Sequence, residues 1–203
     1  MELTANHITL RGSLSSMPQF SHENHGRRFF RFFLEVPRLS GAVDLLPVIA
    51  REDVLNAMEL SDGEMLTVTG QVRSHNVRED GRRRLLIFVF ANLIVCEDGE
   101  PLNEVVLEGP LCREPVYRKT PLGREICDMM LAVPRAFQRA DYLPCILWGR
   151  TAVEGAQYHT RDILRITGRL QSRTYIKVTE TGSEERTAYE ISALTAEPVE
   201  KDT

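Results

Sequence analysis

Apolar and polar residues alternate in several short segments of this chain, and the pattern of the first half recurs in the second. The opening segment of each half carries Ile8, Leu10 and Leu14, or Val105, Leu107 and Leu111. A period of two is typical of a strand with one buried face. Further strands are expected at 29–36, 45–49, 65–72 and 85–95, and at 126–133, 142–148, 163–170 and 187–194.

A helix is predicted in each half only between the third and fourth strands. The segments are 51–60 and 151–158, and Val54, Leu55 and Met58 in the first are spaced for one buried face. Gly12 and Gly109 lie inside the opening strands, where glycine commonly permits a bulge.

The two halves are also similar in sequence, which indicates a duplication. Asn6–Gly12 corresponds to Asn103–Gly109 at an offset of 97, and Val36-Pro37-Arg38 to Val133-Pro134-Arg135. After a one-residue insertion, Thr69-Gly70 corresponds to Thr167-Gly168. The polar segment Glu97–Pro101 contains Gly and Pro and is predicted to be a linker. Two domains are therefore expected, at 1–97 and 102–198.

Three strands, a short helix and two more strands are the order of an oligonucleotide/oligosaccharide-binding (OB) barrel. We therefore predict an all-β protein made of two tandem OB-fold five-stranded barrels, each with one short helix between strands 3 and 4. Another small β-sandwich is the alternative that the pattern leaves open.

Six strings of the second unit occur in order between residues 103 and 196. They are Asn103–Gly109, Glu114-Pro115, Thr120-Pro121-Leu122-Gly123, Leu131–Arg135, Asp141–Ala152 and Gly168–Arg173. In this order and spacing they closely resemble the bacterial single-stranded DNA-binding protein family. The first unit carries a fainter version, strongest at Val36-Pro37-Arg38 and Thr69-Gly70.

The resemblance implies binding of single-stranded DNA with little sequence preference, in replication, recombination or repair, by four OB barrels and without a cofactor. A chain with two barrels would reach four as a homodimer. Family members usually end in a long tail with an acidic tip that recruits other enzymes. This sequence ends at Glu200-Lys201-Asp202-Thr203, so a variant lacking the tail, with a specialised role, is expected.

Sequence-tolerant binding of single strands needs aromatic faces for bases and cations for phosphates. Four aromatic residues of the second unit match the family's base-stacking positions: Phe137, Tyr142, Trp148 and Tyr175. Tyr142 and Trp148 are six residues apart on one strand and hence on one face. Core packing is the alternative role for each ring.

Positive charge is concentrated in the second unit, although the whole chain has a formal net charge of -4. Between residues 113 and 177 there are 12 Lys and Arg against 6 Asp and Glu. Some of these cations are expected only to be solvated. The candidates for phosphate contacts are Arg113, Arg118, Lys119, Arg135, Arg139, Arg150, Arg169, Arg173 and Lys177.

The first unit lacks this set of rings, because Ser40, Leu45, Arg51 and Val77 stand at the four aromatic positions. It carries instead the run Arg27–Phe33, in which Phe and Arg are interleaved, and the triplet Arg82-Arg83-Arg84. Alternation separates Phe30 and Phe32 from Phe29 and Phe33. Core and dimer packing is the favoured interpretation, with a divergent DNA surface as the other, so the first barrel is expected to bind less than the second.

Other classes of function find little support in the sequence. We expect no enzyme and no metal site, since there is no Gly-rich phosphate loop, no nucleophile–base pair and no CxxC motif. The four cysteines are expected to be reduced core thiols. Without a signal peptide or a membrane-length apolar segment, a cytoplasmic, nucleoid-associated protein is expected. A protein-interaction adaptor or primosome-type component is the alternative function, and RNA the alternative strand.

Overall fold

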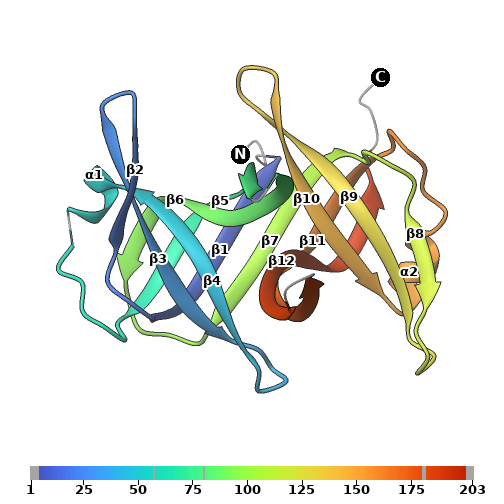
Figure 1. The fold of residues 1–203 in the computed structure, drawn as a ribbon, viewed down its shortest axis with the longest axis horizontal. Coiled ribbons are helices and arrows are strands. Elements are labelled where there is room, and N and C mark those ends of the chain that lie inside the picture. Colours follow the sequence, from blue (N-terminus) through green and yellow to red (C-terminus); the bar gives the residue numbers. More distant parts are fainter. Residues whose placement is uncertain (1–4, 57, 80, 180–181, 200–203) are drawn as a thin grey trace.

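The computed structural model describes residues 5–56, 58–79, 81–179 and 182–199, except for the side chains of Glu79, Arg82 and Thr179. Residues 200–203, where the sequence analysis expected the acidic tail to be missing, lie outside the described residues. The chain forms two β-barrels side by side (Figure 1).

The first barrel closes through five strands. These are β1 (Asn6–Leu14), β3 (Arg27–Pro37), β4 (Val43–Arg51), β5 (Met65–Glu79) and β6 (Arg82–Cys96). Strand β3 pairs with both β1 and β4, β4 pairs in parallel with β6, and β5 pairs with β6 and β1, so the ring is complete. A short strand β2 (Gln19–Asn24) extends β3 as a hairpin, and the one-turn helix α1 (Glu52–Leu55) follows β4.

The second barrel repeats this plan. Its strands are β7 (Leu102–Pro110), β9 (Glu125–Arg135), β10 (Arg139–Trp148), β11 (Ile163–Thr179) and β12 (Gly182–Pro198). Strand β8 (Val116–Lys119) extends β9, and helix α2 (Arg150–Gly155) follows β10. Three strands, a helix and two strands in this order form the predicted OB fold.

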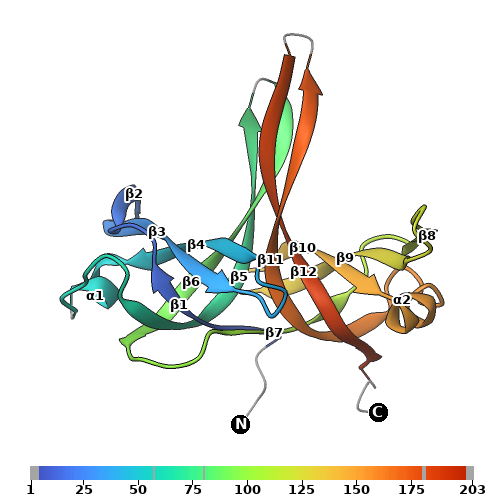
Figure 2. The same cartoon turned by 90° about the horizontal axis from the view of Figure 1, so that it is seen from below.

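Both barrels share one continuous sheet, because β1 pairs antiparallel with β7 from Asn6↔Leu107 to Arg11↔Leu102. The strand order β2-β3-β4-β6-β5-β1-β7-β11-β12-β10-β9-β8 reads the same from either end when equivalent strands are exchanged. The two long hairpins β5–β6 and β11–β12 project together from the middle of the molecule (Figure 2). The duplication therefore produces a pseudo-twofold arrangement within one chain.

Glycine allows the strands of each barrel to approach one another closely. A Cβ on Gly12 would lie 2.3 Å from the carbonyl oxygen of Glu35, and one on Gly109 would lie 2.4 Å from that of Ala132. Gly70 and Gly168 are at equivalent register shifts in β5 and β11. The sequence analysis predicted close approach or a bulge at Gly12 and Gly109, and the structure has close approach there.

Two buried carboxylates join the barrels reciprocally. Asp44 accepts hydrogen bonds from the Ser172 backbone N–H (2.7 Å) and hydroxyl (2.8 Å) of the other barrel. Asp141 accepts them from the Ser74 N–H (2.7 Å) and hydroxyl (3.4 Å). Arg38 forms an ion pair with Asp44 at 2.5 Å. Four charge-assisted contacts of this kind fix how the barrels sit.

Some elements differ from the sequence-based expectations. Each helix is shorter than the predicted 51–60 and 151–158, because a helix this short depends on tertiary packing and only Leu55, or Ala152 and Gly155, is buried. Strands β2 and β8 were not predicted, since all their residues are exposed and carry no period-two pattern.

The four cysteines were all expected in the core, and this is wrong for two of them. Cys127 and Cys145 are buried, whereas Cys96 and Cys112 are exposed. Cys96 ends β6 and Cys112 follows β7, and chain segments at strand ends lie outside the barrel wall.

Candidate nucleic-acid interface

The predicted stacking residues of the second barrel have accessible rings. Tyr142 and Trp148 are 47% and 44% exposed on the outward face of β10. Their partners across the sheet are Ala132 and Ile126 on β9, so the two rings lie at opposite ends of that face. The backbone N–H of Tyr142 donates to the Ser74 hydroxyl at 2.8 Å, which places Tyr142 beside the first barrel.

The other two predicted rings lie on protruding parts of the second barrel. Phe137 is 92% exposed in the β9–β10 turn, where its φ of 61° is in the left-handed region. Tyr175 is 38% exposed on β11 of the long hairpin, and the Arg173 guanidinium lies 5.7 Å from its ring centroid. The four rings are therefore spread over β10, a turn and a hairpin and do not form one cluster.

Four of the nine predicted phosphate-contacting cations form surface ion pairs. The pairs are Arg118–Asp128 (2.8 Å), Lys119–Glu125 (3.8 Å), Arg150–Glu154 (2.8 Å) and Arg173–Glu190 (3.4 Å). The hydrogen bond to Asp128 raises the pKa of Arg118. Such exposed pairs are weak, so an incoming phosphate can compete for the cation. Arg113 and Arg169 are exposed.

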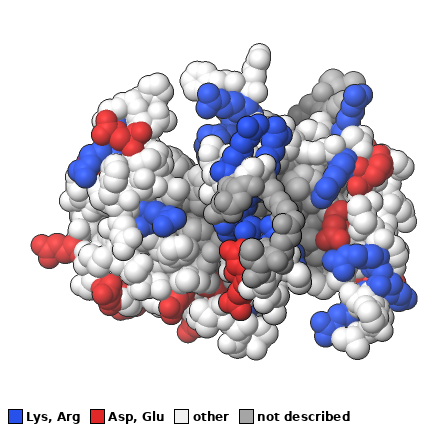
Figure 3. Space-filling model, in the orientation of Figure 1, with Lys and Arg blue, Asp and Glu red and all other residues white. Residues whose placement is uncertain are grey.

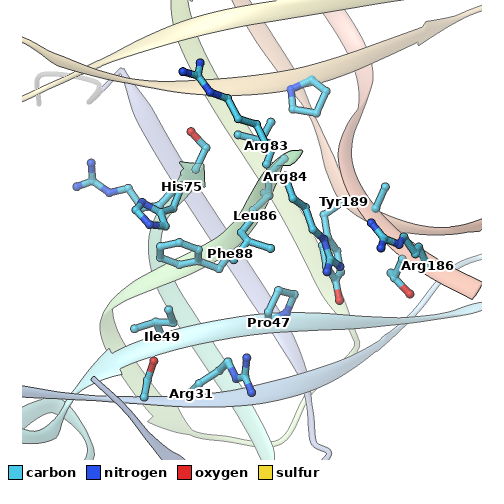
Figure 4. A pocket seen from close by; sticks show the side chains of 18 of the residues that line it. Arg31, Pro47, Ile49, His75, Arg83, Arg84, Leu86, Phe88, Arg186 and Tyr189 are labelled. Carbon is cyan, nitrogen blue, oxygen red and sulfur yellow. The ribbon is translucent and has the colours of Figure 1, made fainter. Parts of the chain in front are cut away.

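The remaining three, Arg135, Arg139 and Lys177, line a groove of about 1790 Å³ between the two barrels. Its floor and walls come from β3, β4, β5 and β6 of the first barrel and from β9, β10, β11 and β12 of the second. Figure 4 shows this groove from close by. Lys and Arg gather at the centre of the face from which the hairpins project (Figure 3).

Basic residues of both barrels dominate the described lining of the groove. The first barrel contributes Arg31, Arg73, Arg83 and Arg84, and the second contributes Arg135, Arg139, Lys177 and Arg186. Glu184 is the one acidic residue of that lining, and Arg186 pairs with it at 2.8 Å. Arg73 and Arg135 both contact the buried Asp141, at 3.1 and 3.4 Å. Burial and the neighbouring Arg135 lower the pKa of Arg73.

Aromatic side chains of the first barrel also reach the groove. Phe29 and Phe33 line it together with Arg31, whereas Phe32 is buried in the core and Phe30 packs against it. The separation predicted from alternation is therefore confirmed. Phe29 is nevertheless largely covered, because His22 stacks on it at 4.7 Å and Phe90 lies 6.1 Å away.

Sequence reasoning did not anticipate a groove between the barrels. The interleaved Arg and Phe of 27–33 and the basic triplet 82–84 were visible, but their distance from Arg139 and Lys177 in sequence concealed that they share one surface. The side chain of Arg82 lies outside the described part of the chain, so only Arg83 and Arg84 of the triplet can be placed.

The structure shows neither a metal site nor a membrane helix in its described residues. Among them, no three His, Cys, Asp or Glu side chains are grouped to hold a metal ion. None of the described helices has the length and apolar character needed to cross a membrane.

Comparison with known proteins agrees with this architecture. Residues 102–199 match the model described as the Single-strand binding protein family. Single-stranded DNA-binding protein B of Bacillus subtilis is 36% identical over 80 residues, which cover 36% of this chain and 71% of that protein. Single-stranded DNA-binding protein 1 of Staphylococcus aureus is 40% identical over 81 residues, or 36% of this chain and 48% of that protein.

The chain spans about half the length of several curated relatives, from 48% to 56%. The wild-type single-stranded DNA binding protein from Thermus aquaticus has the same fold, with a TM-score of 0.80 and 23% identity over 98% of this chain and 94% of that one. The matching family consists of DNA-binding proteins and not of enzymes, which confirms the expectation that this chain is not an enzyme. On the strength of these matches, the chain belongs to the single-strand binding protein family.

Proposed function

We propose that this protein binds single-stranded DNA with little sequence preference, in replication, recombination or repair, and mainly through its C-terminal barrel. The repeat units 1–97 and 102–198 would then be two domains with unequal shares of the binding. The observation that carries the proposal is the exposure of Tyr142 and Trp148 on the outward face of β10, within the part of the chain that matches the family.

The chemistry of this face suits bases rather than a specific sequence. An exposed aromatic ring stacks on any base, and each such contact contributes about 1–3 kcal/mol. Phe137 and Tyr175 would extend the path beyond the two ends of β10. Cations placed around the face would contact the backbone phosphates between the stacked bases. These are Arg113, Arg118, Lys119, Arg135, Arg139, Arg150, Arg169, Arg173 and Lys177.

A titration of the full chain with oligo-dT, followed by the fluorescence of Trp148, tests the proposal. Trp148 is the only tryptophan, so quenching reports stacking at this position directly. We expect quenching on binding, and an affinity that falls as salt rises because neutralised phosphates release their counterions. A parallel titration with oligo-rU compares DNA with RNA.

Substitution of Trp148 gives the quantitative form of the test. Trp148→Ala, measured by the anisotropy of a labelled oligo-dT, should weaken binding by about 5- to 150-fold, the equivalent of 1–3 kcal/mol. Val153→Ala on α2 is the matched control, since it also removes an exposed apolar side chain and should leave affinity unchanged. Equal affinities of wild type and Trp148→Ala, or no binding by the wild type, would favour an adaptor role.

We also propose that the protein is a homodimer, so that four barrels surround the strand. Leu93 and Val95 of β6 are exposed opposite Thr69 and Thr67, on the outer face of the continuous sheet, and Leu194 of β12 is exposed too. Exposed apolar residues on a sheet face mark a candidate interface. Sedimentation should give the mass of two chains, and a mass of one chain with full DNA affinity would contradict the dimer.

A further inference from the structure

The groove between the barrels extends the candidate interface beyond the matched region. One of its walls belongs to residues 22–90 of the first barrel, outside residues 102–199 that match the family model. Its volume of about 1790 Å³ exceeds the range of roughly 300–1,000 Å³ that is usual for small-molecule sites. A groove of this size suits an extended polymer.

The groove carries positive charge that the protein itself does not neutralise. On the first barrel, Arg31 and Arg83 are exposed, and no carboxylate within the described part of the chain pairs with either. On the second barrel, Arg139 and Lys177 face the same space, again without a described carboxylate partner. Cations that converge on a concave surface attract a polyanion more strongly than the same charges on a convex one.

The rings of this groove are already covered, which distinguishes it from the face of the second barrel. His22 stacks on Phe29, and the Arg73 guanidinium lies 5.9 Å from the centroid of Phe90. Arg31 lies in the same way 5.8 Å from the centroid of Phe33. A stack already occupied by protein leaves few free ring faces, so the groove presents guanidinium groups rather than surfaces for bases.

The second barrel has the opposite combination. Trp148 is an exposed ring, while Arg118 and Arg150 are bound to Asp128 and Glu154. The duplication has therefore produced two unlike surfaces, one with accessible rings and one with uncompensated cations.

We propose that the inter-barrel groove is a phosphate-binding site for single-stranded nucleic acid, in which Arg31 and Arg83 of the first barrel hold the backbone of a strand whose bases stack on the second barrel. This inference rests on the proposed function. It assigns the first barrel the electrostatic share of binding and the second barrel the stacking share.

Salt dependence separates these two shares. For single strands, the slope of log affinity against log salt changes by about 0.7 for each phosphate neutralised. The double variant Arg31→Ala, Arg83→Ala should therefore lose about 1.4 from the slope measured with the full chain and labelled oligo-dT. Arg31→Lys, Arg83→Lys keeps both charges and should retain the slope.

The matched control removes the same charge from the same barrel outside the groove. Arg28 and Arg51 pair with Glu52 and Asp53 and do not line the groove. Arg28→Ala, Arg51→Ala should keep the wild-type slope. The thermal unfolding midpoint of each variant verifies that the fold is intact, and Trp148 quenching reports the stacking face separately.

The outcomes distinguish the two proposals. No binding of oligo-dT by the wild type would overturn the proposed function, and the groove inference with it. Normal quenching of Trp148 with an unchanged slope in the groove variant would overturn the groove inference alone. The same unchanged slope, together with binding of polyglutamate that the groove variant loses, would assign the groove to an acidic protein segment.

Discussion

Replacement of Asp141 by alanine tests how the two barrels are held together. Asp141 is completely buried at the junction. It accepts hydrogen bonds from the Ser74 backbone N–H and hydroxyl, and it contacts Arg73 at 3.1 Å and Arg135 at 3.4 Å. The alanine would leave all of these donors without their acceptor.

The expected cost follows from the surroundings of these donors. Removing one partner of a buried ion pair typically costs about 3–5 kcal/mol. The side chains of Arg73 and Arg135 keep some contact with solvent, which lowers the cost, whereas the buried Ser74 N–H loses a bond to a charged acceptor. We therefore expect a loss of about 3 kcal/mol in the free energy of unfolding, or about 6–12 °C in melting temperature for a chain of this size.

The assay is thermal and urea unfolding followed by circular dichroism. Asp141→Asn keeps an acceptor for Ser74 but no negative charge, and should fall between wild type and alanine. Asp128→Ala is the control, because Asp128 pairs with the half-exposed Arg118 and an exposed pair contributes about 1 kcal/mol or less. A melting temperature of Asp141→Ala equal to that of Asp128→Ala would refute the role of the buried carboxylate.

The remaining predictions concern packing and thiol chemistry. Gly168→Ala should lower the free energy of unfolding by about 1–3 kcal/mol, because the added Cβ would lie 2.4 Å from the carbonyl oxygen of Ser192; an unchanged urea midpoint would contradict this. Burial raises the pKa of the Cys145 thiol, whereas Cys96 and Cys112 are exposed. A thiol reagent should therefore modify Cys96 and Cys112 quickly in the native protein and Cys145 only on unfolding, and mass spectrometry of the modified peptides would detect equal rates.

The local pattern of the chain was sufficient to predict the barrel strands and their order. Alternation along a strand reflects the burial of one face, and this depends only on neighbours in the sequence. The opening strand with Ile8 and Leu10, and its repeat with Val105 and Leu107, are buried as expected. The exposure of Tyr142 and Trp148 on one face of β10 also follows from their spacing of six residues.

The lengths of elements at the barrel margins did not follow from the sequence. β2 and β8 are wholly exposed, so their formation depends on pairing with β3 and β9 and leaves no mark in the hydrophobic pattern. The short helices are limited in the same way by the few residues that they bury. Such features are decided by a neighbouring strand rather than by local preference.

By itself the sequence determined the duplication, the fold of each unit and the candidate rings, since all three are recorded in spacing along the chain. Only the tertiary structure decided that β1 pairs with β7, that Asp44 and Asp141 cross between the barrels, and that Arg31 and Arg83 share a groove with Arg139 and Lys177. The physical reason is distance along the chain. A charge acts on whatever lies within a few ångströms of it, and here those neighbours are separated by roughly half the sequence and meet only after both barrels have folded.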